Sequence, residues 1–374
     1  MRIQHVITKA DVGGAQTYAL ELATAQVADG HQVRIAAGTI GRMADIARSR
    51  GIGIDEERSL RREVSRGSDR RAARELVERL EAWRPDVVHA HSSKAGVLAR
   101  LAARRCSVPA VYTAHGWPFQ AGAPLTQRIM SWAGETFAAH RWGDVICLTD
   151  AEAARARRWK VVPNHRLHVV PNGLPDVDRA YRADTRAEET EPNAPPTVGV
   201  VMVARFTPPK AQRGVILALA SIPDVPWRMT FVGDGAGLTD AVSLAKQLGL
   251  EDRIAFLGDR PDVPQILASH DIGLLFSRYE GMPLALLEAM RAGLACVAND
   301  LTGVRTLFGE DAGLTVAFEE RSLAAGIRCL VEDPDERRRL GRAARARYEA
   351  DFSIEVNARR VMDVYVGVID SMRR

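Results

Sequence analysis

The chain has 374 residues, 46% of them apolar, which is enough for two domains with cores of their own. Its four cysteines have no paired spacing, which argues against a disulfide framework or a cysteine-based zinc site and favours a reducing compartment. No apolar run reaches the ~18 residues of a membrane span and the N-terminal run is too short for a signal peptide, so we expect a cytoplasmic protein.

The net charge of +4 is unevenly distributed along the chain. Residues 1–175 carry 26 Lys and Arg against 17 Asp and Glu, so the remainder is mildly acidic. A basic first half predicts an anionic partner, either a membrane surface or a phosphorylated acceptor. Nucleic acid is not expected as a partner, because no nucleic-acid-binding motif accompanies the charge.

Apolar runs and helical patterns alternate through the first half of the chain. Strands are predicted at 2–8, 31–37, 86–90, 110–113 and 144–148, with helical periodicity between them. This alternation predicts an α/β domain with a doubly wound parallel sheet, which we place at 1–180.

A break at 181–196 is predicted to be a linker, because it is acidic and proline-rich and lacks apolar periodicity. The alternation then restarts and predicts a second α/β domain at 197–350, followed by a helix within 351–374. Its predicted strands are 197–203, 228–232, 254–257, 272–276 and 295–298. Ligands of such sheets bind beyond the carboxyl ends of the strands, and two such domains facing each other would form a cleft there.

Several candidate residues of the first half follow predicted strands. Gly13 and Gly14 would let the backbone approach a ligand closely, although the three-glycine dinucleotide fingerprint is missing. His115 lies beside Gly116 and Trp117, where a histidine can be structural or functional.

A second group of polar residues lies near residue 90. Lys94, with Ser92 and Ser93, begins a predicted helix and could bind an acceptor phosphate or simply start the helix. His89 and His91 have no acidic or cysteine partners at metal spacing, so we interpret them as a core and a loop histidine.

Two cations follow the first strand of the second half. Arg205 can grip a diphosphate with two hydrogen bonds, and Lys210 can add a point charge. A solvated loop is the alternative interpretation. Gly233 opens a Gly-Asp-Gly turn after the next strand, which suits either a plain turn or a nucleotide loop.

The segment 277–298 carries two carboxylates eight positions apart. Glu280 precedes a predicted helix, Glu288 lies inside it, and Pro283 suits the first helical turn. The positive helix end would seat a phosphate, while carboxylates accept hydrogen bonds from hydroxyl groups. A sugar attached to a nucleoside diphosphate meets both needs. The amides of this phosphate seat would be those of Gly281, Met282 and Leu284.

This segment resembles the Glu-x7-Glu signature of retaining glycosyltransferases of family 4, which have the GT-B fold of two Rossmann-like domains facing across a cleft. The resemblance implies transfer of a sugar from a nucleoside-diphosphate donor, which we expect to be UDP-linked, to a sugar or lipid-linked sugar acceptor, as in exopolysaccharide assembly. It also implies that the helix at 351–374 crosses back to the first domain. Gln16, Ala204, Gln212 and the 301–306 segment depart from the family pattern, so the usual sugar preference does not carry over.

The resemblance assigns roles to the candidate residues. Glu280 would orient sugar hydroxyls rather than attack, and Glu288 would hold the ribose. No Asp-x-Asp metal motif lies in a suitable loop, so neither a metal nor another cofactor is expected, and fixed cations would neutralise the leaving diphosphate. The predicted catalytic residues are His115, Arg205, Lys210 and Glu280. The predicted donor-binding residues are Gly13, Gly14, Gly233, Gly281, Met282, Pro283, Leu284 and Glu288, and the acceptor-side candidates are Lys94 and Trp117.

Two other functions stay open, a sugar-nucleotide 2-epimerase of GT-B-like fold and a non-catalytic subunit that binds nucleotide sugars. Basic clusters in the first half suit either solvated helix faces or docking on the inner, anionic face of the plasma membrane. An aromatic-rich stretch within 117–142 lies in the same half of the chain. The basic residues are Arg61, Arg62, Arg66, Arg70, Arg71, Arg74, Arg155, Arg157, Arg158 and Lys160.

Overall fold

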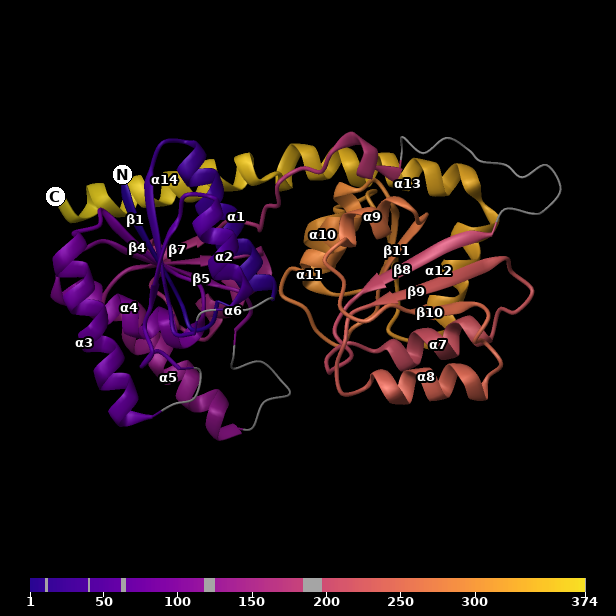
Figure 1. Cartoon of the computed structure of the whole chain (residues 1–374), viewed down its shortest axis with the longest axis horizontal. Coiled ribbons are helices and arrows are strands. Elements are labelled where there is room, and N and C mark those ends of the chain that lie inside the picture. The colour runs from indigo at the N-terminus through magenta and orange to yellow at the C-terminus, as the bar shows by residue number, and fades with distance from the viewer. Residues whose placement is uncertain (11–12, 40, 62–64, 118–124, 184–196, 374) are drawn as a thin grey trace. The chain divides into compact units, whose positions relative to one another are not determined.

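The structure, a computed structural model, describes the chain except for residues 11–12, 40, 62–64, 118–124, 184–196 and 374 (Figure 1). The chain divides into two compact units, which we call the first unit (Met1–Pro175 with Ile354–Arg374) and the second unit (Asp176–Ser353). The predicted linker at 181–196 lies outside the described residues from 184 onward. Its described end is held by a hydrogen bond of 2.7 Å from Ala183 N–H to Ala292 O.

A seven-stranded parallel sheet forms the centre of the first unit. Its strand order is β3-β2-β1-β4-β5-β6-β7, so the winding direction reverses between β1 and β4, where doubly wound sheets bind their ligands. The strands are β1 Arg2–Ile7, β2 Gln32–Ala37, β3 Gly53–Glu56, β4 Val87–Ala90, β5 Ala110–Ala114, β6 Asp144–Cys147 and β7 Leu167–Val169.

Helices of the first unit pack on its sheet and on one another. In α4 the buried Ala95, Leu98, Ala99 and Ala102 recur at helical spacing, and the helix packs on β4 and β5. The C-terminal helix α14 packs on α1 and belongs to this unit. The helices are α1 Gly14–Ala28, α2 Arg42–Ser49, α3 Arg66–Trp83, α4 Ser93–Arg105, α5 Leu125–Arg141, α6 Asp150–Arg158 and α14 Ile354–Arg373.

The second unit repeats this plan with six parallel strands in the order β10-β9-β8-β11-β12-β13, and its winding reverses between β8 and β11. The strands are β8 Val198–Val203, β9 Trp227–Val232, β10 Ile254–Phe256, β11 Ile272–Leu275, β12 Ala295–Asn299 and β13 Leu314–Val316. The helices are α7 Gln212–Ala220, α8 Leu238–Gln247, α9 Val263–Ala268, α10 Leu284–Arg291, α11 Thr302–Phe308, α12 Glu320–Glu332 and α13 Pro334–Arg347.

The predicted α/β class with two doubly wound parallel sheets is confirmed. All the strands expected from apolar runs are present, whereas β3, β7 and β13 were not predicted. Each of these three lies at the edge of its sheet and is only partly buried, so its sequence lacks a continuous apolar run. Among the described helices, none is both long enough and apolar enough to cross a membrane.

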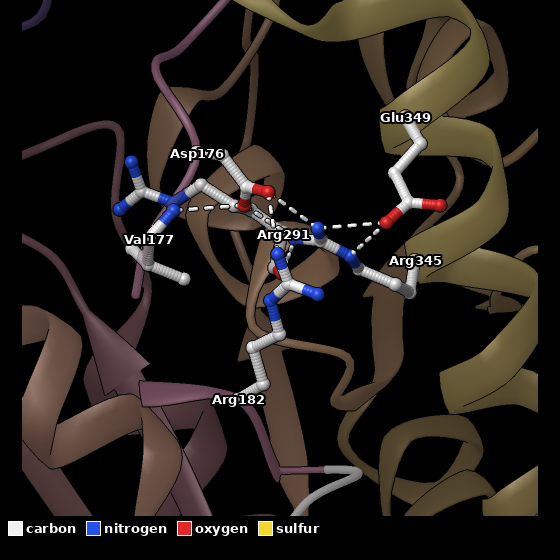
Figure 2. A network of polar contacts seen from close by, with 6 residues as sticks. All are labelled: Asp176, Val177, Arg182, Arg291, Arg345 and Glu349. Carbon is white, nitrogen blue, oxygen red and sulfur yellow. Dashed lines mark hydrogen bonds and ion pairs between the residues drawn. The ribbon is translucent and has the colours of Figure 1, made fainter. Parts of the chain in front are cut away.

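A polar network fastens the beginning of the second unit to the end of α13 (Figure 2). Arg345 donates two hydrogen bonds of 2.6 Å to the carboxylate of Asp176, and Arg182 donates another of 2.7 Å. Arg345 also donates to Glu349 at 2.7 Å and to the carbonyl of Arg291 at 2.6 Å. Burial alone would raise the pKa of Asp176, but the hydrogen bonds from Arg345 and the backbone hold that pKa below its usual range. The paired guanidinium therefore fixes the first residue of this unit.

Candidate functional site

The predicted donor-binding residues of the second unit gather at one edge of its sheet. Arg205 follows β8, Gly233 follows β9, and the 276–283 loop follows β11. Because all six strands are parallel, their carboxyl ends share that edge. The predicted cations and carboxylates are therefore brought to the same side of the second unit.

Lys210 and Glu280 form an ion pair in this loop cluster, with 2.5 Å between Lys210 Nζ and Glu280 Oε1. Both side chains are largely buried, at 18% and 14% exposure, so their attraction is less screened than that of a surface pair. The two loops are also joined through the backbone, because Arg278 N–H donates to Pro209 O at 3.0 Å. The pair places one cation and one carboxylate side by side at the sheet edge.

The Arg205 loop is held by its backbone while its side chain stays exposed. Gln212, which replaces a residue common in the family pattern, donates from Nε2 to Arg205 O at 3.0 Å. Gly233 has a φ of 129°, and a Cβ there would lie 2.3 Å from Ala204 O. This glycine is needed for the β9 loop to pass closely behind Arg205. A cavity of about 450 Å³ opens between residues 206–213 and α8, and Lys210 lines it.

Asn299, at the end of β12, shapes the loop that carries Glu280, a role that the sequence did not reveal. Its side chain accepts from Ser277 N–H at 2.8 Å and donates to Ser277 O at 2.9 Å. The Asn299 side chain is buried, so this double hydrogen bond replaces the β-ladder beyond the strand end. A single Asn at a strand end has no distinctive sequence signal.

Glu288 lies in the second turn of α10. Pro283 is the residue that precedes this helix, one position before the predicted first turn, and Met282 and Pro283 are buried. Burial raises the pKa of Glu288, and the nearby Arg291 opposes that rise. A half-buried carboxylate with a raised pKa is stabilised by hydrogen-bond donors, which the hydroxyl groups of a ligand can supply. Gly303 of α11 packs so closely that a Cβ would lie 1.9 Å from Gly281 O.

In the first unit, His115 follows β5 at the carboxyl edge of its sheet, and Gly13 directly precedes α1 at the same edge, with Gly14 as the first residue of that helix. Burial lowers the pKa of His115 to about 4, so its ring is neutral at pH 7. The ring of Tyr18 meets it edge-on, with 5.2 Å between ring centres.

The two acceptor-side candidates have partners within the first unit. Trp117 is 2% exposed and donates from Nε1 to Glu152 O at 3.1 Å, and Lys94 forms an ion pair with Asp69. These contacts fasten the loop after β5 to α6, and α4 to α3. Any acceptor contact by Lys94 or Trp117 would use groups already engaged in packing, and their proposed role stays a prediction.

A cluster of buried histidines lies beneath the site edge of the first unit. His5 of β1, His89 of β4 and His91 directly after β4 bring candidate ligand atoms within 4.8 Å of one another. The nitrogens are already engaged in hydrogen bonds, with the exception of His91 Nδ1, which has no partner among the described residues. The cluster is therefore arranged as a hydrogen-bonded network. Sequence spacing missed it because His5 is far from the others along the chain.

Two family models match the chain, one in each half. A glycosyl transferase 4-like domain matches residues 13–173, and glycosyl transferases group 1 matches residues 183–347. The second match contains the Arg205, Lys210, Glu280 and Glu288 set.

Named relatives and solved structures agree with these matches. The chain is 29% identical, over 83% of either sequence, to an Escherichia coli UDP-Gal:alpha-D-GlcNAc-diphosphoundecaprenol alpha-1,3-galactosyltransferase. It is 27% identical to the putative glycosyltransferase EpsD of Bacillus subtilis, over 79% of this chain and 80% of that protein. The crystal structure of Anabaena HepE with UDP and glucose shares the fold, with a TM-score of 0.79 at 22% identity over 96% of this chain and 98% of that one.

Proposed function

Since the chain belongs to the GT-B glycosyltransferases of family 4, with a glycosyl transferase 4-like domain followed by a group 1 domain, we propose that it transfers a sugar from a UDP-linked donor to a lipid-linked saccharide. The observation that carries the proposal is the Lys210–Glu280 ion pair at the carboxyl edge of the second sheet. The same unit carries the exposed Arg205 after β8 and the half-buried Glu288 on α10.

Each of these groups has a part in the proposed donor complex. Arg205 and Lys210 bind the diphosphate, which also lies at the N-terminal end of α10. Glu288 accepts hydrogen bonds from the ribose hydroxyls, which stabilise its half-buried carboxylate. Glu280 orients hydroxyls of the transferred sugar while it holds Lys210 in place. His115 of the first unit, neutral at pH 7, is proposed to contact the sugar being transferred.

The chemical step separates the anomeric carbon from the diphosphate oxygen. Negative charge grows on that oxygen, and Arg205 and Lys210 stabilise it. The acceptor hydroxyl attacks from the face that the diphosphate leaves, and its proton passes to the departing oxygen, so the anomeric configuration is retained. Preorganised donors of this kind contribute about 10²- to 10³-fold each. We propose that these fixed cations suffice without a metal ion, and that transfer continues in excess EDTA.

The proposed acceptor follows from the first unit's surface and from the relatives. The name of the Escherichia coli relative includes a diphosphoundecaprenol-linked acceptor. In the first unit, α5 exposes Leu125, Ile129, Met130 and Phe137, and Arg141 lies over the Phe137 ring at 4.0 Å. Apolar side chains flanked by cations suit the surface of an anionic bilayer, where a lipid-linked saccharide would be found. Peripheral contact with the cytoplasmic leaflet is thus part of the proposal.

A donor screen followed by a transfer assay tests this function. We expect UDP-sugars to raise the Tm more than GDP- or ADP-sugars, and one of them to support transfer to a polyprenyl-diphosphate-linked sugar. Incubation of UDP-N-acetylglucosamine without acceptor is the control for a 2-epimerase, and we expect no epimer. Donor binding without transfer to any acceptor in a broad panel would instead indicate a non-catalytic subunit and contradict the proposal.

A further inference from the structure

The buried histidine network of the first unit forms a chain of hydrogen bonds from His91 to Thr113. It connects β1, β4, β5, α1 and the C-terminal helix α14. His5 Nδ1 lies 2.8 Å from His91 Nε2, and His5 Nε2 lies 2.8 Å from Gln26 Oε1. Gln26 Nε2 then donates to the Tyr365 hydroxyl at 3.4 Å. His89 joins that hydroxyl, 2.6 Å from its Nδ1, to Thr113 Oγ1, 2.7 Å from its Nε2.

The orientation of the Gln26 amide determines which ring nitrogens of His5 and His91 carry the protons. With Oε1 facing His5, the His5 proton lies on Nε2, so His5 Nδ1 must accept from His91 Nε2–H. His91 is then left with a lone pair on Nδ1. The opposite direction would leave a buried N–H at that nitrogen without a partner, and unpaired buried N–H groups are rarer than unpaired acceptors. Burial lowers the pKa of both His5 and His91, so both rings are neutral at pH 7.

His91 Nδ1 marks the end of the chain and lies near His115. His91 is 1% exposed, and among the described residues nothing partners either its Nδ1 or the buried Nε2 of His115. The two ring centres are 5.9 Å apart, and the rings are tilted by 33°. Two buried nitrogens without partners on neighbouring rings suit a single ordered water, which can bond to both.

We propose that His91 is a positioning residue, which holds the ring of His115 through one internal water bound between His91 Nδ1 and His115 Nε2. This inference rests on the proposed role of His115. The network behind His91 fixes which nitrogen offers the lone pair, so the water and the His115 ring have one preferred orientation. The C-terminal helix thereby takes part in shaping the site, because Tyr365 belongs to the chain of hydrogen bonds.

Two substitutions of His91 separate this role from simple packing. H91Q keeps a donor where Nε2–H points toward His5 and removes the acceptor at the Nδ1 position. H91N keeps an acceptor near the Nδ1 position and leaves His5 Nδ1 without its donor. We expect H91Q to keep its Tm and UDP affinity but lower kcat by about tenfold, the effect of one lost hydrogen bond. H91N should lose a few degrees of Tm and keep kcat per folded molecule.

The proton positions are tested separately by histidine ¹H–¹⁵N NMR at pH 7 on the wild-type protein. We expect His91 to carry its proton on Nε2 and His5 on Nε2. A proton on His91 Nδ1 would overturn the network direction, and equal kcat losses in H91Q and H91N would show that His91 only supports the fold. A wild-type rate in H91Q would overturn the positioning role. If the wild type transfers no sugar, the proposed function and the role of His91 in it both fail, while the NMR result still decides the network.

Discussion

At the scale of single residues, the proposed chemistry depends on Lys210, which is held by Glu280 at 2.5 Å. We expect K210M to lower kcat by about 10²- to 10³-fold, because its charge acts most strongly on the departing diphosphate. The affinity for UDP should change less. The control is K246M, which removes an exposed lysine from α8. Steady-state kinetics measures kcat and calorimetry measures the UDP affinity of the two variants. Equal kcat values for K210M and K246M would contradict a role of Lys210 in the chemical step.

Glu288 gives the donor site a pH dependence. Its pKa is raised by burial, and only the ionised carboxylate accepts hydrogen bonds at both oxygens. The affinity for UDP should therefore be highest at pH values above the raised pKa of Glu288, and it should fall as the pH drops through that pKa. E288Q should bind UDP about tenfold more weakly at neutral pH and lose this dependence. Isothermal titration calorimetry between pH 8 and 5 measures the UDP affinity at each pH. E251Q, which changes an exposed glutamate, is the control. If UDP binding to E288Q had the same pH dependence as binding to the wild type, the assignment of Glu288 to the ribose would be contradicted.

The sequence was informative about residues whose chemistry is visible in a short segment. Glu280 and Glu288, with Arg205 and Lys210, could be proposed because charged groups follow apolar strands. Asn299 could not, since its role arises from a turn 22 residues away in the chain. His5 and Tyr365 were missed for the same reason, as their partners come from distant strands and helices.

At the scale of secondary-structure elements, the buried histidines make β1 and β4 sensitive to acid. Burial lowers the pKa of His5 to about 4, whereas an unfolded histidine binds a proton near pH 6.5. The unfolded state binds more protons between these values, so the contribution of His5 is complete above pH 6.5 and declines toward pH 4. Integrated over that window, the loss is about 3 kcal/mol.

H5Q should therefore make the stability of the first unit decline less between pH 6.5 and 4.5, by about 1.4 kcal/mol per pH unit. Amide hydrogen exchange of β1 and β4 reports this locally. Glu152, whose pKa is raised to about 7 by burial, makes the opposite contribution in both proteins, so it cancels in the difference between them. That difference reports His5 together with its effect on the pKa of His89 and His91. H165Q changes an exposed histidine and should leave the slope unchanged. If the stability of H5Q and that of the wild type declined equally with falling pH, the contribution assigned to His5 would be contradicted.

The central strands could be predicted because they are buried on both faces and form continuous apolar runs. The edge strands β3, β7 and β13 could not, because their side chains are partly exposed and their pairing depends on a neighbour already in place. Helix α14 was expected from its periodicity, but only the structure shows that it supplies Tyr365 to the histidine network.

At the scale of the whole molecule, the excess of basic residues in 1–175 favours anionic membranes. We expect flotation with vesicles that contain anionic lipid, and less of it as salt rises. Replacing Ile129 and Met130 of the exposed α5 face by Ser should weaken flotation, whereas replacing the exposed Val242 and Leu248 of the second unit should not. No flotation at low salt would contradict membrane contact.

The basic and aromatic stretches in the first half are only partly described by the structure. Phe119, Arg62 and the side chain of Arg66 lie outside the described residues.

The most direct test of the proposed function is a crystal structure of the protein with UDP bound. We predict the diphosphate within hydrogen-bonding distance of Arg205 and Lys210, and the ribose hydroxyls on Glu288. A UDP whose diphosphate lies away from both cations would contradict the site and the mechanism built on it.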